Sequence, residues 1–107
     1  MLYSASFDGT VRVWRGDETE WEAAATVDFG GQTVWDVKPL DGGEKVVCCG
    51  AGGLLAVVDG ATQTVLCRLE DPSLRDVYSV AVHHRRIAVG CGDNSIRLFS
   101  FVWAACD

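Results

Sequence analysis

The chain has 107 residues, enough for one small domain, and 49% of them are hydrophobic. Fifteen acidic residues against nine basic ones give a net charge of −6. This charge argues against nucleic acid or an anionic membrane surface as the partner, because both require a basic face. No apolar run has the length of a membrane span, and no leader typical of a signal peptide is visible.

The first recognisable unit is a strand, a tight turn and a second strand. Residues Leu2–Ser6 and Thr10–Arg15 predict the two strands, and the pair that begins with Asp8 predicts the turn. Ser4, Asp8 and Trp14 supply a hydroxyl, a carboxylate and an indole N–H. We expect these three groups to form one buried polar network, so that replacing Asp8 by Ala destabilises the fold.

Similar units recur with a period of about 43 residues. Residues Val11–Trp14 have counterparts in Leu55–Val58 and Ile96–Phe99, and Val34–Val37 has a counterpart in Val77–Val80. This period, with four short strands in each copy, is typical of a β-propeller blade.

No segment has the periodicity of a helix, so the predicted fold class is all-β, with four-stranded antiparallel blades. The strands expected after the first two are Glu20–Val27, Val34–Lys38, Glu44–Gly50, Leu54–Asp59, Gln63–Leu69, Val77–Val82, Arg86–Gly90 and Ser95–Ser100. Residues 1–27 would form three strands of one blade, 28–69 a full blade and 70–107 most of a third.

A propeller needs at least four blades to close, so we expect the chain to be part of a longer protein and unstable alone. The apolar tail Phe101–Asp107 follows the last strand where a fourth strand would begin.

These units resemble the WD40 repeat family. The residues that carry the resemblance are Ser4, Asp8, Gly9, Thr10, Val11, Val13 and Trp14. In that family a Trp, a Ser or Thr, an Asp and a His link the inner strands of each blade. Ser4, Asp8 and Trp14 match three of those places, and Asp93 keeps the Asp in the third copy, whereas Gly52 replaces it in the middle copy.

A narrower resemblance is to the WD40 proteins of cytosolic iron–sulfur protein assembly. It rests on Ser4–Val11, the acidic linker Glu18–Trp21, Ala25–Val27, Thr33–Trp35, Val77–Ala81 and Gly90–Phe99. The resemblance implies a non-enzymatic scaffold of the cytoplasm, and also of the nucleus, without a cofactor or a small-molecule substrate. Its partners would be other assembly-complex subunits and the apo-proteins that receive iron–sulfur clusters.

WD40 proteins commonly bind partners on the face where the turns after each second strand emerge. The residues that match the usual contact positions are Phe7, Thr33, Trp35, Arg75, Asp76 and Tyr78. The alternative is that Trp35 and Tyr78 only pack between blades.

The remaining motifs leave two other functions open. Five cysteines form no CxxC pair, and we interpret them as reduced, buried thiols. Direct metal or cluster binding by Cys48, Cys49 and Cys91 is one alternative, and a WD40 scaffold of a ubiquitin ligase or of RNA processing is the other. No nucleophile–base pair or phosphate loop is visible, so no catalytic, cofactor-binding or metal residue is assigned. His83 and His84 are expected at the surface.

Overall fold

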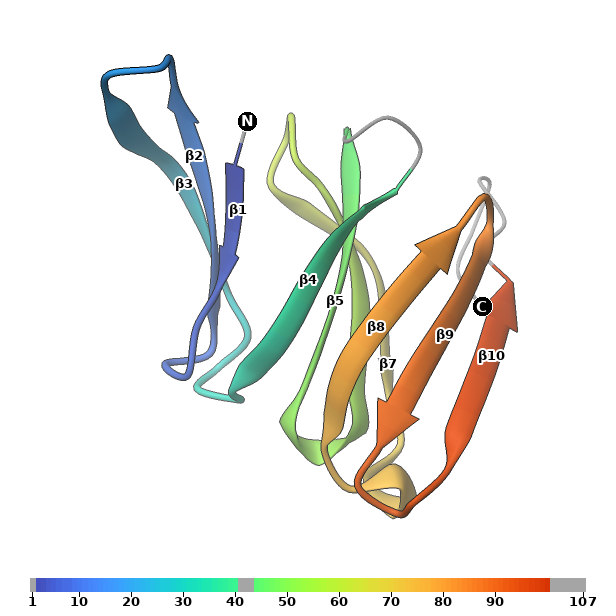
Figure 1. Cartoon of the computed structure of the whole chain (residues 1–107). Coiled ribbons are helices and arrows are strands. Elements are labelled where there is room, and N and C mark those ends of the chain that lie inside the picture. The colour runs from blue at the N-terminus through green and yellow to red at the C-terminus, as the bar shows by residue number, and fades with distance from the viewer. Residues whose placement is uncertain (1, 41–43, 101–107) are drawn as a thin grey trace.

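The structure is a computed structural model that describes residues 2–40 and 44–100. Within these residues the chain forms three antiparallel sheets (Figure 1). The first contains β1 (Leu2–Ala5), β2 (Thr10–Gly16) and β3 (Trp21–Asp28). The second contains β4 (Val34–Leu40), β5 (Lys45–Gly50), β6 (Leu54–Asp59) and β7 (Thr64–Glu70). The third contains β8 (Val77–His83), β9 (Arg86–Cys91) and β10 (Ile96–Ser100), with β9 in the centre.

The predicted all-β class is confirmed, and every expected strand is present with small shifts at its ends. Two single-turn 3₁₀ helices, η2 (Ala51–Gly53) and η3 (Pro72–Leu74), were not expected from the sequence. None of the described segments is a helix long and apolar enough to cross a membrane. The expectations for residues 41–43 and for the tail 101–107 lie outside the described residues, and the blade boundaries stay a prediction.

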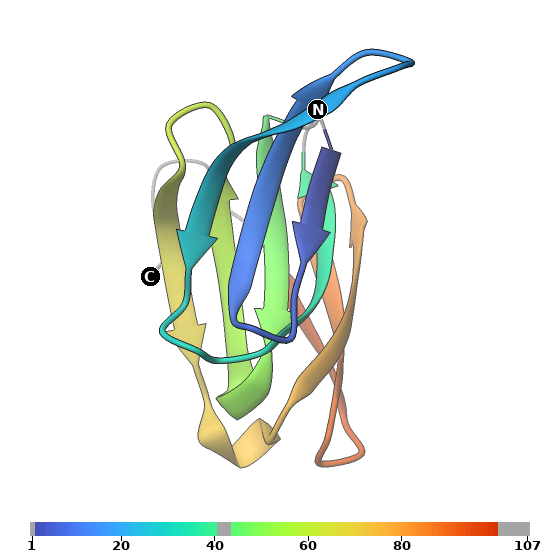
Figure 2. The same ribbon diagram turned by 90° about the vertical axis from the view of Figure 1, so that its left-hand side faces the viewer.

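The three sheets stand side by side, with β1, β4 and β8 on the same side of the molecule (Figure 1). Seen from the first sheet, the sheets lie one behind another, and the β2–β3 hairpin extends beyond the others (Figure 2). The sheets are not joined edge to edge by strand pairing, since each sheet pairs only its own strands. Side-chain packing and a few polar contacts must therefore hold them together.

The apolar core has two parts, one on each face of the second sheet. Val46 and Cys48 of β5 pack toward the first sheet, whereas Val47 and Cys49 pack toward the third. All four side chains are buried. Because side chains alternate along a strand, a strand buried on both faces has a continuous apolar sequence, as β5 and β6 do.

Strand β4 is longer than the sequence predicted. The expected strand ends at Lys38, but Pro39 pairs with Val46 and the strand continues to Leu40. Proline lacks an N–H donor, and an edge strand such as β4 tolerates it. Leu40 is fully buried, so packing favours the extended conformation here.

Gly53, in the β5–β6 turn, lies close to the backbone of Asp71, and a substitution there tests this close approach. Its φ is +77°, and a Cβ added there would lie 1.8 Å from the carbonyl oxygen of Asp71. We expect Gly53→Ala to lower the free energy of unfolding by about 3 kcal/mol or more, measured by urea denaturation of the full-length protein. Gly30→Ala is the matched control, since Gly30 has a φ of +71° but no atom within 4 Å of the added Cβ. The control should lose only about 1 kcal/mol; equal losses would contradict the close approach.

Candidate functional site

The turns β1–β2 and β9–β10 are built in the same way. Asp8 Oδ1 accepts hydrogen bonds from Thr10 N at 3.0 Å and from Thr10 Oγ1 at 2.6 Å. Asp93 Oδ1 accepts from Ser95 N at 2.9 Å and also from Ser95 Oγ. Each carboxylate thus closes the turn that contains it.

The predicted polar network of Ser4, Asp8 and Trp14 is wrong in one member. Trp14 Nε1 donates to Ser4 Oγ at 3.0 Å. Asp8 instead bonds to Thr10 and pairs with Arg12 at 3.3 Å, and half of its side chain is exposed. The reason is local: Asp8 lies in the turn itself, where the donors of Thr10 are nearer than the indole of Trp14.

The middle turn lacks a carboxylate, and a residue from outside the second sheet takes part in it. Asp76, just before β8, accepts a hydrogen bond at Oδ1 from Gly52 N at 3.4 Å. Its Oδ2 accepts from Trp35 Nε1 at 3.0 Å, and its backbone carbonyl accepts from Gly92 N at 2.7 Å. Asp76 therefore connects the second sheet to the third.

Thr33 occupies the equivalent position before β4 and connects the first sheet to the second. Its hydroxyl donates to the carbonyl of Phe7 at 2.9 Å. The adjacent Val34 N donates to the carbonyl of Ser6 at 3.0 Å. The same place in two successive repeats thus joins one sheet to the preceding one.

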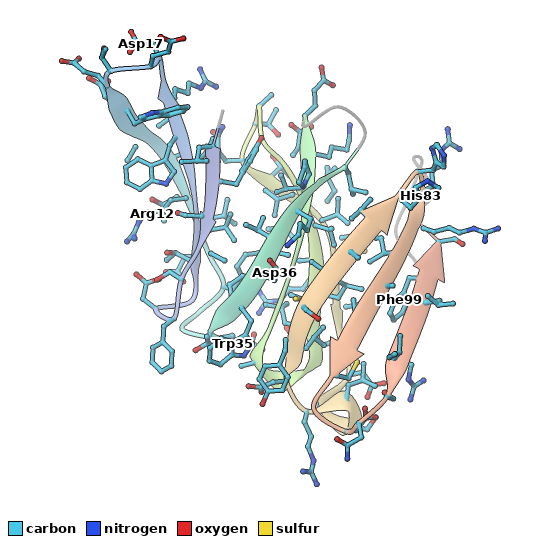
Figure 3. All side chains as sticks on the ribbon, in the orientation of Figure 1. Arg12, Asp17, Trp35, Asp36, His83 and Phe99 are labelled. Atoms are coloured by element: carbon cyan, nitrogen blue, oxygen red, sulfur yellow. The ribbon has the colours of Figure 1, made fainter. Side chains whose placement is uncertain are left out.

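Asp36 forms a further connection between sheets, which the sequence patterns do not predict. Its Oδ2 accepts from Val80 N of β8 at 3.1 Å, and its Oδ1 lies 2.8 Å from Lys38 Nζ. The sequence indicates this role of Asp36 only weakly, by a carboxylate two residues after the start of an inner strand. Figure 3 shows Asp36 on β4, beside β8.

Trp35 and Tyr78 lie at equivalent irregularities of β4 and β8. The strand register shifts at Trp35 in the pairing of β4 with β5, and at Tyr78 in the pairing of β8 with β9. An extra residue of this kind turns its side chain away from the regular sheet. The neighbouring Val34 and Val77 remain buried, whereas Trp35 and Tyr78 are exposed.

Phe7, Trp35 and Tyr78 form a continuous line of rings, which we call the aromatic row. The ring centroids of Phe7 and Trp35 are 6.1 Å apart, and those of Trp35 and Tyr78 are 5.8 Å apart. The exposed fractions are 77% for Phe7, 41% for Trp35 and 54% for Tyr78. The rings therefore pack against one another and still expose area to solvent. They combine the packing between blades and the exposed contact positions that the sequence suggested as alternatives.

The structure brings together the residues expected at a partner face. Thr33 and Asp76 bond to the first and middle turns, and the exposed Arg75 precedes Asp76. Figure 3 places Trp35 at the turn end of β4 and His83 at the opposite end of the molecule. His83 and His84 are exposed, as expected, with ring centroids 4.2 Å apart.

The free cysteines do not converge. Cys48 lies in the core between the first and second sheets, whereas Cys49 and Cys91 lie in the core between the second and third. Burial raises the pKa of both the Cys48 and Cys49 thiols to about 12, so both are protonated at neutral pH. Among residues 2–40 and 44–100, no three His, Cys, Asp or Glu side chains group as metal ligands would.

The fold and the turns are similar to those of WD40 repeat proteins. The family model "WD domain, G-beta repeat" matches residues 1–15. The three sheets have the antiparallel architecture of WD40 propeller blades.

A particular relative extends this similarity over most of the sequence. The chain is 33% identical, over 104 residues, to the probable cytosolic iron-sulfur protein assembly protein CIAO1 homolog of Ixodes scapularis. The match covers 92% of this chain and 33% of the relative, so the chain spans about a third of the length of the protein it matches.

The turn carboxylates predict an acid-dependent stability. Hydrogen bonds from Thr10 lower the pKa of Asp8, and hydrogen bonds from Ser95 lower the pKa of Asp93. A carboxyl whose pKa is lower in the folded state contributes stability above its unfolded value, near 3.9, and loses it as the pH falls through the folded value. The urea midpoint of the full-length protein should therefore fall below about pH 4. Asp8→Asn with Asp93→Asn should flatten this fall. Parallel curves for wild type and double variant would contradict the assignment.

Burial of Cys48 and Cys49 predicts that their thiols are protected from alkylation in the folded protein. Cys48 and Cys49 are fully buried and protonated, so a thiol-specific alkylating reagent at pH 8 should leave both unmodified in the folded protein. Both should react after unfolding in guanidinium, as measured by mass spectrometry of peptides. Rapid modification of either residue under native conditions would contradict the packing of β5.

Proposed function

We propose that this chain forms part of a non-catalytic scaffold that acts in cytosolic iron–sulfur protein assembly. It would bind other subunits of the assembly complex and the apo-proteins that receive clusters. The observation that carries the proposal is the aromatic row, in a chain that resembles an iron–sulfur protein assembly relative over most of its length.

The aromatic row has the properties of a protein-binding anchor. Aromatic side chains supply large contact areas with few rotatable bonds, and they are enriched among the residues that dominate binding energy. Three such rings from three sheets would give a partner a contact surface that continues across the sheet boundaries. The exposed Arg75, which precedes Asp76 in the sequence, would add a charged contact at the rim of this surface.

The fold supports a scaffold more directly than a catalyst. We assign residues 1–27, 28–69 and 70–107 to successive propeller blades, whose turns form the partner face. The free cysteines have no role as cluster ligands in this proposal, because Cys48 faces a different core from Cys49 and Cys91. Iron–sulfur clusters would be the cargo of bound partners rather than a resident cofactor.

The proposal can be tested by complementation of cells depleted of the protein. Trp35→Ala with Tyr78→Ala removes two of the three rings of the row, so we expect the activity of a cytosolic iron–sulfur enzyme to fall at least severalfold relative to wild-type complementation. A mitochondrial iron–sulfur enzyme in the same cells should keep its activity.

The matched control is Leu66→Ala, which removes an exposed hydrophobic side chain outside the row. Circular dichroism must show that both variants fold. Full recovery of the cytosolic enzyme by the folded double variant would place the partner surface elsewhere, and equal losses in both compartments would contradict a cytosolic role.

A further inference from the structure

We propose that Asp76 is a positioning residue that holds Trp35 in the aromatic row. The binding consequence rests on the proposed function, whereas the positioning itself does not. Asp76 Oδ2 accepts the indole Nε1–H of Trp35 at 3.0 Å, from a residue 41 positions away in the sequence. This bond joins a side chain of the second sheet to the segment that leads into the third.

The carboxylate of Asp76 supplies a hydrogen-bond acceptor that the middle turn itself lacks. In the first turn, Asp8 N donates to Ser6 Oγ at 3.2 Å. Gly50 occupies the position of Ser6 in the middle turn and has no side chain to accept the equivalent N–H. Gly52 N donates instead to Asp76 Oδ1 at 3.4 Å.

The backbone of Asp76 is fixed from the other side. Gly92 N, in the β9–β10 turn, donates to the Asp76 carbonyl at 2.7 Å. The two carboxylate oxygens therefore have separate tasks on a restrained backbone: Oδ1 accepts from the middle turn and Oδ2 accepts from the indole.

The bond selects one orientation for an exposed ring. Trp35 lies at a register irregularity, where neighbouring strand residues do not enclose its side chain, and 41% of it is exposed. The T-shaped contact with Phe7 and the tilted contact with Tyr78 restrain the ring by packing, which is weakly directional. A hydrogen bond to Nε1 is directional and restrains the remaining rotation of the indole. Asp76 thus acts on a partner through Trp35.

The direct test follows the indole N–H of Trp35 by ¹H–¹⁵N NMR of the full-length protein labelled on tryptophan. Trp35→Phe identifies the resonance. Asp76→Ala should shift and broaden this resonance, and Asp76→Asn should give an intermediate shift, because an amide oxygen is a weaker acceptor than a carboxylate. Asp93→Ala, the matched control, removes a turn carboxylate that does not bond to Trp35 and should leave the resonance in place.

An unchanged Trp35 resonance in the Asp76 variants would overturn the proposal. An equal shift in Asp93→Ala would also overturn it, since the effect would then be a general loosening of turns. If Asp76→Ala does not fold, the intermediate shift expected for Asp76→Asn decides by itself.

A second experiment separates positioning from a merely structural role. Asp76→Ala should weaken the capture of assembly-complex subunits by about fivefold, the factor that corresponds to one lost hydrogen bond. In a Trp35→Phe background, which keeps a ring but has no N–H, Asp76→Ala should cause a smaller further loss, because only its bond to Gly52 N remains to be removed. A loss of the same size in both backgrounds would show that Asp76 acts independently of Trp35. Should the Trp35→Ala, Tyr78→Ala variant bind normally, the proposed function fails while the NMR result still decides the role of Asp76.

Discussion

One polar side chain before each inner strand joins that strand's sheet to the preceding sheet. Thr33, before β4, donates to the carbonyl of Phe7, and Asp76, before β8, accepts from the amide of Gly52. The two residues occupy equivalent places in successive repeats but use opposite hydrogen-bond roles. Burial of apolar faces holds the sheets together without fixing their relative rotation, because it has no direction. The directional bonds at this end supply the missing constraint.

The aromatic row depends on this constraint. Trp35 and Tyr78 are carried by different sheets, and their centroids are 5.8 Å apart only because β4 and β8 lie in a fixed relation. Asp36 contributes by accepting a hydrogen bond from Val80 N across the same boundary. The apolar core between the second and third sheets packs at the same boundary. An aromatic row that extends across three sheets is therefore a property of their junctions as much as of the rings.

Strand positions and the grouping of Trp35 and Tyr78 could be predicted from the sequence, because alternation and the repeat of about 43 residues are local patterns. The core role of Phe29 was missed, since it lies outside any strand and is buried by contacts distant in sequence. Asp8 was placed in the wrong bond because a repeat shows which positions correspond but not which donor is nearest. The two bonds of Asp76 depend on the spacing of two sheets, which no local pattern contains.

Hydrogen exchange of individual amides tests most directly the claim that polar bonds between sheets fix their arrangement. The amides of Val34 and Val80 donate across sheet boundaries, to Ser6 and Asp36, whereas Val47 lies within a buried strand. If these bonds fix the arrangement, Val34 and Val80 in the full-length protein should be protected to within about tenfold of Val47, because they open only when the sheets separate. Exchange of Val34 and Val80 at the rate of exposed loops, with Val47 still protected, would show that the sheets move independently and would contradict the account.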